Sequence, residues 1–342
     1  MNNLRFILRL CLSFHLLAVV AVTQEQQFAN IGDLKLQSGR AIRNCRVGYR
    51  TFGKLAADKS NVVVFPTWAG GTTEQLKSAI GPGRLIDSNS YFVIAIDALS
   101  NGVSSSPSNS RLQPRMRFPQ FTLRDTVESQ HELLTKKLHI PRVKAIVGIS
   151  MGGMQVFQWL VSYPQFMEKA IPIVGSPRLA PYDLLLWQAQ IEALMRDRDW
   201  KGGNYSANPA RVLDFAFSEL LLTTPADYNR RKTREQALAD LVKAKSEIGF
   251  DANDKIRQVQ SMMELDVSRG FGGSLERAAQ SIRAKVFVVV AKYDHVVTPQ
   301  PAEEFARLLG AKLLDLDGDC GHLATACESQ RLREAVADFL TN

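Results

Sequence analysis

The sequence predicts an α/β domain with a mostly parallel central sheet and a helical cap inserted after the sixth strand. Short apolar runs recur along the chain, and segments with helical periodicity lie between them. One interval of roughly a hundred residues then lacks such runs. Continuous β-branched runs are typical of parallel strands covered on both faces, and their alternation with helices is typical of a doubly wound sheet.

The first residues have the pattern of a secretory signal peptide. Arg5 and Arg9 lead into an apolar run, Leu10–Val22, which ends in small residues before a polar stretch that starts at Gln24. This run is too short to predict a membrane span, although an uncleaved anchor is the alternative. We therefore expect residues 1–23 to be a cleaved signal peptide. The mature protein would then be secreted or periplasmic, with no stable membrane association.

The composition is that of a globular protein with a sizeable core, since 45% of the residues are hydrophobic and 22% are charged. The formal charge of +8 is spread along the chain without a dense basic tract, which argues against a nucleic-acid partner. No Cys/His spacing typical of zinc is present, so we expect no metal and no cofactor. Cys320 and Cys327 could form a local disulfide, with two free buried thiols as the alternative.

Residues 24–176 are predicted to form the first part of the core. Alternating apolar and polar residues over 28–52 predict an antiparallel hairpin at the sheet edge. Thr122 and Asp125 resemble a capping box, which predicts a helix that begins at Thr122 and ends at Leu138. Continuous apolar runs predict buried strands at residues 61–65, 91–96, 143–149 and 170–174.

Residues 177–282 are rich in helix formers and contain no convincing core strand, so we expect them to form the cap. Helical periodicity marks residues 184–196, 211–222, 234–245 and 254–266. The strand pattern resumes at residues 285–291 and 311–316, and these strands need the earlier ones as partners. Residues 283–342 are therefore predicted to complete the core.

One serine lies between two glycines directly after the apolar run that ends at Ile149. The stretch Gly148–Gly152 fits the pattern Gly-x-Ser-x-Gly, and an apolar helical segment follows it. In a tight strand-to-helix turn the glycines avoid steric clashes, and the helix N-terminus favours developing negative charge. The pattern predicts that Ser150 is a nucleophile, with a serine that only caps the helix as the alternative.

A serine hydroxyl needs a base that accepts its proton and a third group that orients this base. Asp294 and His322 each follow a predicted strand, at the carboxyl ends where α/β sheets place their chemistry. With Ser150 they have the order Ser, Asp, His. His295 competes with His322 for the role of base, but it directly follows Asp294 and is awkwardly placed to be oriented by it.

Two backbone N–H groups should stabilise the oxyanion that forms during acyl transfer. One is predicted to be the N–H of Met151, the residue after the nucleophile. The other is expected in the loop that follows the strand at 61–65, where Trp68 is the candidate. In a milder interpretation, the Trp68 side chain only forms a wall of the acyl pocket.

Several motifs are similar to those of the homoserine O-acetyltransferase family, whose members have the α/β-hydrolase fold. They are the segments 49–53, 80–87, 91–94, 118–125, 148–155 and 199–205. The resemblance covers nearly the whole chain after residue 23, and it implies a helical cap and a ping-pong reaction through an acyl-serine. It also implies Ser150 as the nucleophile, Asp294 as the acid and His322 as the base. Because members of that family often pair through the cap, a homodimer through the cap is expected.

Two departures from that family bear on the function. The aspartate that follows the catalytic histidine and helps to hold the acceptor's amino group is replaced by Leu323, and no arginine for the acceptor's carboxylate stands near Gln190 or Ile191. A pocket without both partners would leave a zwitterion's charges unpaired, at a cost on the order of several kcal/mol. We therefore predict a secreted serine hydrolase that cleaves a carboxylic ester of a small molecule, with a short acyl group. The alternatives are an O-acyltransferase that acts on another alcohol and a non-catalytic binding protein.

Overall fold

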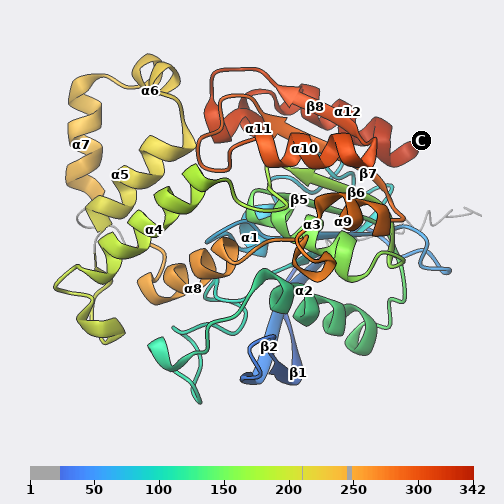
Figure 1. The fold of residues 1–342 in the computed structure, drawn as a ribbon, viewed down its shortest axis with the longest axis horizontal. Helices are drawn as coiled ribbons and strands as arrows, with labels where there is room; N and C mark the ends of the chain where they lie inside the picture. Colours follow the sequence, from blue (N-terminus) through green and yellow to red (C-terminus); the bar gives the residue numbers. More distant parts are fainter. Residues whose placement is uncertain (1–23, 210, 245–248) are drawn as a thin grey trace, which may run out of the picture.

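Figure 1 shows a computed structural model of the chain, which describes residues 24–209, 211–244 and 249–342. The residues predicted to form the signal peptide lie outside these ranges. Within the ranges, no helix combines the length and the apolar character that a membrane span requires.

Eight strands form one sheet in the order β1-β2-β4-β3-β5-β6-β7-β8. Strands β1 (Gln27–Lys35) and β2 (Ala41–Phe52) are an antiparallel hairpin at one edge, and β2 also pairs antiparallel with β4. The other strands are parallel, namely β3 (Val62–Pro66), β4 (Phe92–Ile96), β5 (Val143–Ile149), β6 (Met167–Ile173), β7 (Lys285–Ala291) and β8 (Lys312–Leu316). The predicted mostly parallel sheet with an edge hairpin is confirmed.

Helices cover both faces of this sheet, because successive strand residues point to opposite faces and both sets are apolar. In β3, Val62 and Val64 belong to one buried layer, whereas Val63 and Phe65 belong to the other. The first layer includes residues of α2 (Leu123–Glu132), α3 (Met151–Ser162), α9 (Leu275–Ser281) and α10 (Gln300–Leu309). The second includes residues of α1 (Thr73–Leu76) and α12 (Ser329–Thr341).

The predicted helical cap follows the sixth strand, as expected. Between β6 and β7 the chain forms α4 (Pro181–Met195), α5 (Arg211–Leu222), α6 (Pro225–Arg231), α7 (Arg234–Ala244), α8 (Ala252–Met263) and then α9. Helices α5, α6 and α7 lie farthest from the sheet (Figure 1). Helix α9 falls within residues 177–282, yet it contacts α10 and α3, so it packs with the helices of the core. The exact division between core and cap stays a prediction.

Helix α8 attaches the cap to the core through buried polar contacts. The side-chain amide of Gln258 donates to the carbonyl of Leu99 at 2.9 Å, and the carboxyl group of Asp254 accepts from the backbone N–H of Ser108 at 2.9 Å. Burial raises the pKa of Asp254 to about 8, because the low-dielectric surroundings disfavour its charged form. This raised pKa favours the neutral form of the carboxyl group near pH 7.

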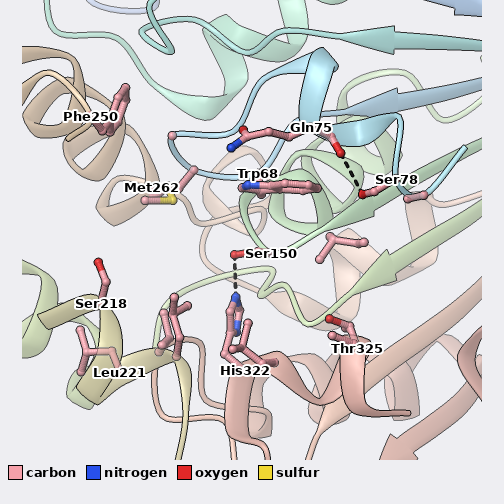
Figure 2. Close-up of a pocket in the computed structure, with 18 of the residues that line it drawn as sticks. Trp68, Gln75, Ser78, Ser150, Ser218, Leu221, Phe250, Met262, His322 and Thr325 are labelled. Carbon is pink, nitrogen blue, oxygen red and sulfur yellow. Dashed lines mark hydrogen bonds between the residues drawn. The ribbon is translucent and has the colours of Figure 1, made fainter. Parts of the chain in front are cut away.

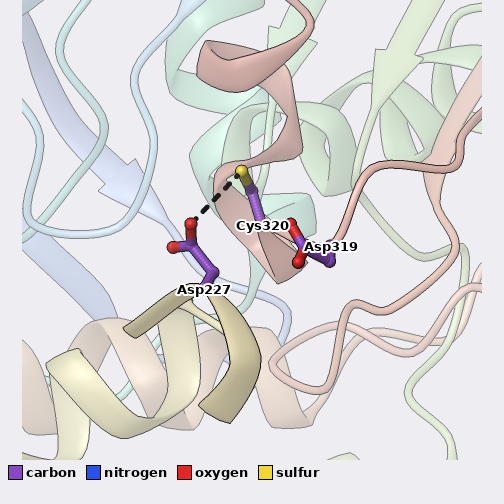
Figure 3. Close-up of side chains that lie close together, drawn as sticks. All are labelled: Asp227, Asp319 and Cys320. Atoms are coloured by element: carbon purple, nitrogen blue, oxygen red, sulfur yellow. Dashed lines mark hydrogen bonds between the residues drawn. The ribbon is translucent and has the colours of Figure 1, made fainter. Parts of the chain in front are cut away.

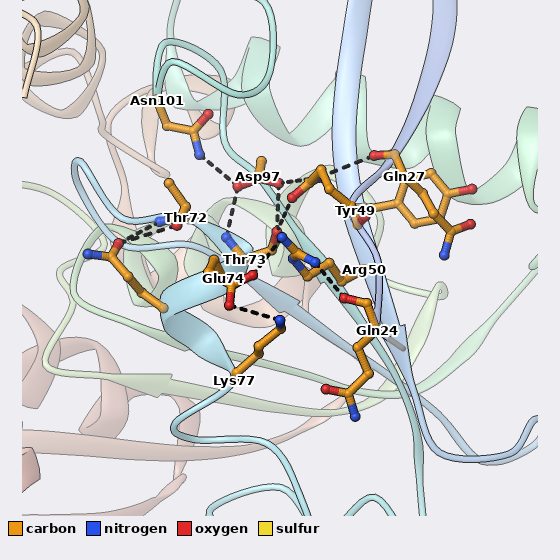
Figure 4. Close-up of polar contacts among 12 residues, drawn as sticks. Gln24, Gln27, Tyr49, Arg50, Thr72, Thr73, Glu74, Lys77, Asp97 and Asn101 are labelled. Carbon is orange, nitrogen blue, oxygen red and sulfur yellow. Dashed lines mark hydrogen bonds and ion pairs between the residues drawn. The ribbon is translucent and has the colours of Figure 1, made fainter. Parts of the chain in front are cut away.

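A second buried carboxylate joins the first described residues to the core (Figure 4). Asp97, which directly follows β4, accepts from both the backbone N–H and the hydroxyl of Thr73 at 2.9 Å. It also accepts from the side-chain amides of Asn101 and Gln26, each at 2.9 Å. These contacts fix α1 and the segment after residue 23 against the loop that follows β4.

Candidate active site

Ser150 lies in the turn between β5 and α3, in a backbone conformation that few residues other than glycine adopt. Its φ is 58° and its ψ is −122°, and its N–H donates to the carbonyl of Ile173 at 2.9 Å. Such strain persists only where the surroundings hold the backbone firmly, and it is concentrated at functional sites. The sharp turn places the hydroxyl at the N-terminus of α3, where the helix dipole favours negative charge.

Both glycines that flank this serine are required by close approach. A Cβ atom on Gly148 would lie 2.3 Å from the backbone of Gly152, and one on Gly152 would lie 2.7 Å from the carbonyl oxygen of Pro66. A side chain at position 148 would collide with the first turn of α3, and one at position 152 would push this turn away from β3. The pattern Gly-x-Ser-x-Gly therefore reflects the packing of the turn itself.

The structure brings Ser150, His322 and Asp294 together in one chain of hydrogen bonds. Nε2 of His322 lies 2.9 Å from Oγ of Ser150, and Nδ1 lies 2.6 Å from Oδ2 of Asp294 (Figure 2). Asp294 and His322 are buried, and the other oxygen of Asp294 accepts from the backbone N–H groups of Val296 and Val297. With Nδ1 protonated toward the carboxylate, Nε2 is free to accept the proton of the serine hydroxyl.

The competing histidine points elsewhere. Nε2 of His295 lies 3.2 Å from the carbonyl oxygen of Leu220, which belongs to α5 of the cap. Although His295 follows Asp294 directly, it is His322 that contacts the carboxylate. The ring of His131 stacks on Tyr163, with ring centroids 3.8 Å apart, on the far side of α3 from the turn.

The turn that carries His322 is closed by a disulfide bond between Cys320 and Cys327. Of the two alternatives for these cysteines, the structure has the bridge, while Cys45 is a free and buried thiol. Both bridged residues flank His322, so the bond limits the movement of the short helical turns between them.

A cluster of Asp227, Asp319 and Cys320 lies beside this turn (Figure 3). The sulfur of Cys320 is engaged in the disulfide, and both carboxylates form ion pairs with Arg230, at 2.9 Å and 2.6 Å. Asp227 is also paired with Arg231. A disulfide sulfur is not a thiolate ligand, so these described residues do not fit a metal ion. The cluster instead connects α6 of the cap to the loop that precedes His322.

The two residues predicted to donate to the oxyanion, Met151 and Trp68, belong to different segments. Met151 is the first residue of α3, where a backbone N–H has no intrahelical acceptor. The Trp68 ring lies directly above the serine hydroxyl in Figure 2. Its loop is fixed because the N–H of Gly70 donates to Gln258 of α8 at 2.8 Å. The role of both N–H groups stays a prediction.

A buried network behind α3 was not foreseen from the sequence. The side-chain amide of Gln155 donates to the carbonyl oxygen of Thr67 at 3.0 Å and accepts from Gln130 at 2.6 Å. Gln130 in turn accepts from the indole N–H of Trp159 at 2.9 Å. These contacts hold the loop before Trp68 against α3. A glutamine within an otherwise apolar helical segment was the available signal.

Asp183 in the cap is a further residue that the sequence analysis did not identify. The carboxyl group of Asp183, at the start of α4, accepts from the backbone N–H of Thr298 at 3.2 Å and from its hydroxyl at 3.1 Å. Trp187, one turn later, donates to the carbonyl of Val296 at 3.0 Å. Burial raises the pKa of Asp183. Helix α4 therefore holds the loop in which Asp294 lies, and an acidic residue soon after Pro181 was the only sequence signal.

Ser150 and His322 open into a cavity of about 940 Å³. Core loops and cap helices both line it, and its apolar walls include Trp68, Trp187, Leu221, Phe250 and Met262. Leu323 and Gln190 also line the cavity, whereas Ile191 is buried in the cap. A hydrogen-bonded serine beside a largely apolar cavity is suited to covalent attack on a small acyl compound.

Residues 61–325 match the family described by the α/β hydrolase fold. The chain belongs to this family. An ethyl acetate hydrolase of Pseudomonas veronii is 33% identical over 92% of this α/β hydrolase and 95% of its own length. A homoserine O-acetyltransferase of Chlorobaculum tepidum is 31% identical over 92% of this chain and 94% of its own. The resemblance to the homoserine O-acetyltransferases is thereby confirmed.

A solved structure of an acetylester hydrolase from Corynebacterium glutamicum has the same architecture as this α/β hydrolase. The two superpose with a TM-score of 0.87 at 27% identity, over 93% of this chain and 96% of the other. The predicted fold class is therefore confirmed by sequence and by structure.

Proposed function

We propose that this α/β hydrolase is a serine esterase that cleaves carboxylic esters with a short acyl group through an acyl-serine intermediate. The observation that carries the proposal is the chain of hydrogen bonds from Asp294 through His322 to Ser150, at the floor of an apolar cavity. Relatives named as an ethyl acetate hydrolase and an acetylester hydrolase support a small ester as the substrate.

In the first half of the reaction, His322 accepts the hydroxyl proton at Nε2 while Oγ of Ser150 attacks the ester carbonyl carbon. Asp294 stabilises the imidazolium that forms and keeps the ring in the correct orientation. The negative charge that develops on the carbonyl oxygen is stabilised by the N–H groups of Met151 and Trp68 and by the N-terminus of α3. His322 then gives its proton to the departing alkoxide, so that the alcohol leaves and an acyl-serine remains.

In the second half, a water molecule takes the place of the alcohol. His322 accepts a proton from this water as its oxygen attacks the acyl carbon, and then returns a proton to Oγ of Ser150 as the carboxylic acid leaves. The enzyme returns to its starting protonation state. No cofactor is needed for either step.

The choice between water and another alcohol as the acceptor depends on the cavity. An O-acyltransferase acting on an alcohol other than homoserine is the second candidate, because relatives named as homoserine O-acetyltransferases cover most of the chain. Leu323 and Gln190 line the cavity, and neither offers an ionic partner to the amino or carboxylate group of homoserine. No aspartate or glutamate is among the described residues that line the cavity, so the amino group of a zwitterionic acceptor would lose its hydration there without an ionic partner, which favours water as the acceptor.

The proposed location is outside the cytoplasm, in the periplasm or the surroundings of the cell. The signal-peptide pattern of residues 1–23 and the Cys320–Cys327 disulfide support it, since disulfides persist in oxidising compartments. Measuring the mass and the N-terminal sequence of the exported protein tests this proposal, and a mature protein that begins at Met1 would contradict it.

A homodimer through the cap remains part of the proposal. Leu185, Leu220 and Val242, on three different cap helices, are exposed to 74%, 69% and 65%. Apolar side chains of this kind are typical of surfaces that a second molecule covers. Sedimentation of the protein at micromolar concentration, beside a Leu185→Glu/Leu220→Glu variant, checks this expectation. A wild type that sediments as a monomer would contradict it.

The esterase proposal is tested with acyl-enzyme formed from an activated ester. We expect its decay in water to account for turnover and to change little when candidate alcohols, homoserine among them, are added. Decay that is negligible in water but fast with one alcohol would replace the esterase with the acyltransferase. Failure of a fluorophosphonate probe to label Ser150 would instead leave a non-catalytic binding protein.

A further inference from the structure

We propose that the alcohol part of the natural ester carries a carboxylate, which Arg84 and Arg333 bind at the mouth of the cavity. The inference rests on the proposed function and deepens it, because it names the substrate class of the same site. Both arginines line the cavity that contains Ser150 and His322.

Charge along the cavity wall is of one sign. Among the lining residues that the structure describes, Arg84, Lys255 and Arg333 are the side chains with a permanent charge, and no aspartate or glutamate accompanies them. A site built for a neutral ester has no need of cations on its walls. Arginine side chains on the wall of a cavity attract an anionic ligand and orient its charged end.

Arg333 is available for a ligand in a way that its neighbour on the same helix is not. Arg331 is paired with Asp317 and Glu328, each at 2.7 Å. Arg333, two residues later on α12, is exposed and has no ion-pair partner among the described residues. Its guanidinium group can therefore offer two parallel N–H donors to a carboxylate, the geometry that arginine provides best.

The two arginines approach the cavity from segments that pack in the same apolar layer. The guanidinium group of Arg84 donates to the carbonyl oxygen of Ser78 at 2.6 Å, which places it beside the loop after α1. Ser329 and Arg333 are one helical turn apart on α12, and both line the cavity. Leu76 of α1 and Leu332 of α12 belong to the same buried layer on one face of the sheet.

The cavity extends from Ser150 in two directions with different chemistry. In Figure 2, Ser78 and Thr325 lie on one side of Ser150, while Phe250 and Leu221 lie on the other. The first side leads toward the segments of Arg84 and Arg333, and the second is made by the cap. An ester bound across the serine can thus direct one part into the apolar cap and its polar part toward the arginines.

We assign the anionic end to the alcohol part because the acyl group proposed above is short. A short acyl group cannot extend from Ser150 to side chains at the mouth, whereas the alcohol part of the ester can. The substrate class is therefore that of short-acyl esters of hydroxycarboxylic acids. Hydrolysis breaks the bond between the acyl carbon and the ester oxygen, water supplies the hydroxyl of the released acid, and a hydroxycarboxylate leaves.

The test compares two probes that differ in one charge, 4-acetoxybenzoate and its methyl ester, in the full-length mature enzyme. We expect kcat/KM for the carboxylate to fall by about threefold to fivefold in either Arg84→Gln or Arg333→Gln, and by about tenfold in the double variant. The methyl ester should react at unchanged rates in all three. Raising the salt concentration should reduce the preference of the wild type for the carboxylate.

Arg331→Gln is the matched control, because it removes a charge from the same helix without lining the cavity, and it should leave the ratio of the two rates unchanged. A ratio that is the same in the wild type and in the double variant, or that changes equally in Arg331→Gln, would overturn the inference. Loss of activity on both esters with intact Ser150 labelling would overturn it as well. If the wild type hydrolyses neither ester and Ser150 is not labelled, the proposed function itself has failed.

Discussion

The cavity around Ser150 has two walls, one from the core and one from the cap, which differ in structure and in polarity. The core wall consists of turns at the ends of strands, and their side chains converge on Ser150 through short polar contacts. The cap wall consists of helix surfaces and the loop before α8, and it presents apolar side chains such as Leu221, Phe250 and Met262. The core wall thus sets the chemistry, while the cap wall sets the size and polarity of what can enter.

Polar contacts join the cap to the core at several points around the cavity. Asp183 of the cap binds the loop that follows Asp294, Gln258 binds the loop that follows Trp68, and Asp254 binds the loop that follows β4. Substitutions in the core wall should therefore abolish the reaction, those at the junction with the loop of Asp294 should weaken it, and those at the junction of Asp254 should change stability alone.

The largest effect is expected for Ser150→Ala, which removes the proposed nucleophile from the core wall. Turnover of a short ester should fall on the order of 10⁴-fold or more, since neighbouring groups cannot replace the covalent step. The melting temperature should not fall, because alanine occupies the same space. Initial rates and thermal unfolding of the two proteins check this, and residual activity near one tenth of the wild type would contradict the role of Ser150.

The two histidines near Asp294 give the next test. His322→Ala should reduce kcat on the order of 10⁴-fold, because the serine loses its base, whereas His295→Ala should change it by less than about threefold. His295 contacts the cap carbonyl of Leu220, so its loss should affect stability more than catalysis. The opposite ranking in steady-state kinetics would show that the base is His295 and not His322.

At the junction, Asp183→Asn should lower kcat by about tenfold with little change in KM, because the loop of Asp294 loses part of its support. Asp183 is a positioning residue and does not touch the ester. Its replacement should also shift the pH at which kcat reaches half of its maximum, since Asp294 orients His322. Gln188→Ala, an exposed substitution on the same helix, is the control. If Asp183→Asn changes the melting temperature but not kcat or its pH dependence, the contact between Asp183 and Thr298 has a structural role only.

The smallest effect on activity is expected for Asp254→Asn, which should change the pH dependence of stability. The carboxyl group ionises near pH 4 in the unfolded chain but near pH 8 in the folded one, so the wild type loses stability as the pH rises through this window. The variant has no carboxyl group to ionise. Its free energy of unfolding, relative to that of the wild type, should therefore increase by at most about 1.4 kcal/mol for each pH unit that the pH rises.

Urea unfolding between pH 5 and pH 8 measures this difference, with kcat expected to change by less than about twofold. Asp199→Asn serves as the reference, because it removes an exposed carboxylate that also lies within residues 177–282. Parallel stability curves for wild type and Asp254→Asn would contradict the assignment of a neutral carboxyl group at this junction.

The core wall could be predicted from the sequence because local rules determine it. An apolar run, a glycine-flanked serine and an apolar helix predict the turn at Ser150, and loops after β7 and β8 carry Asp294 and His322. Parallel strands bring their carboxyl ends to one edge, so sequence order alone placed these residues together. The bounds of β5 and β7 agree with the predicted runs to the residue.

The cap wall could not be predicted in the same way. Helical periodicity locates α5 and α7, but it does not say which face of each helix meets the core. The partners of Asp183 and Gln155 are far away in the chain, at Thr298 and Thr67, and no spacing rule connects them. The pairing of Cys320 with Cys327 likewise depended on the distance between their Cα atoms, 6.6 Å, which periodicity does not supply.

At position 150, the residue that the reaction requires is not the residue that the backbone conformation favours. Glycine would adopt a φ of 58° with less strain than serine does, and it would also abolish the hydroxyl. The most active form of this chain is therefore not its most robust one, and a search for heat-tolerant variants that ignored turnover would select against the nucleophile.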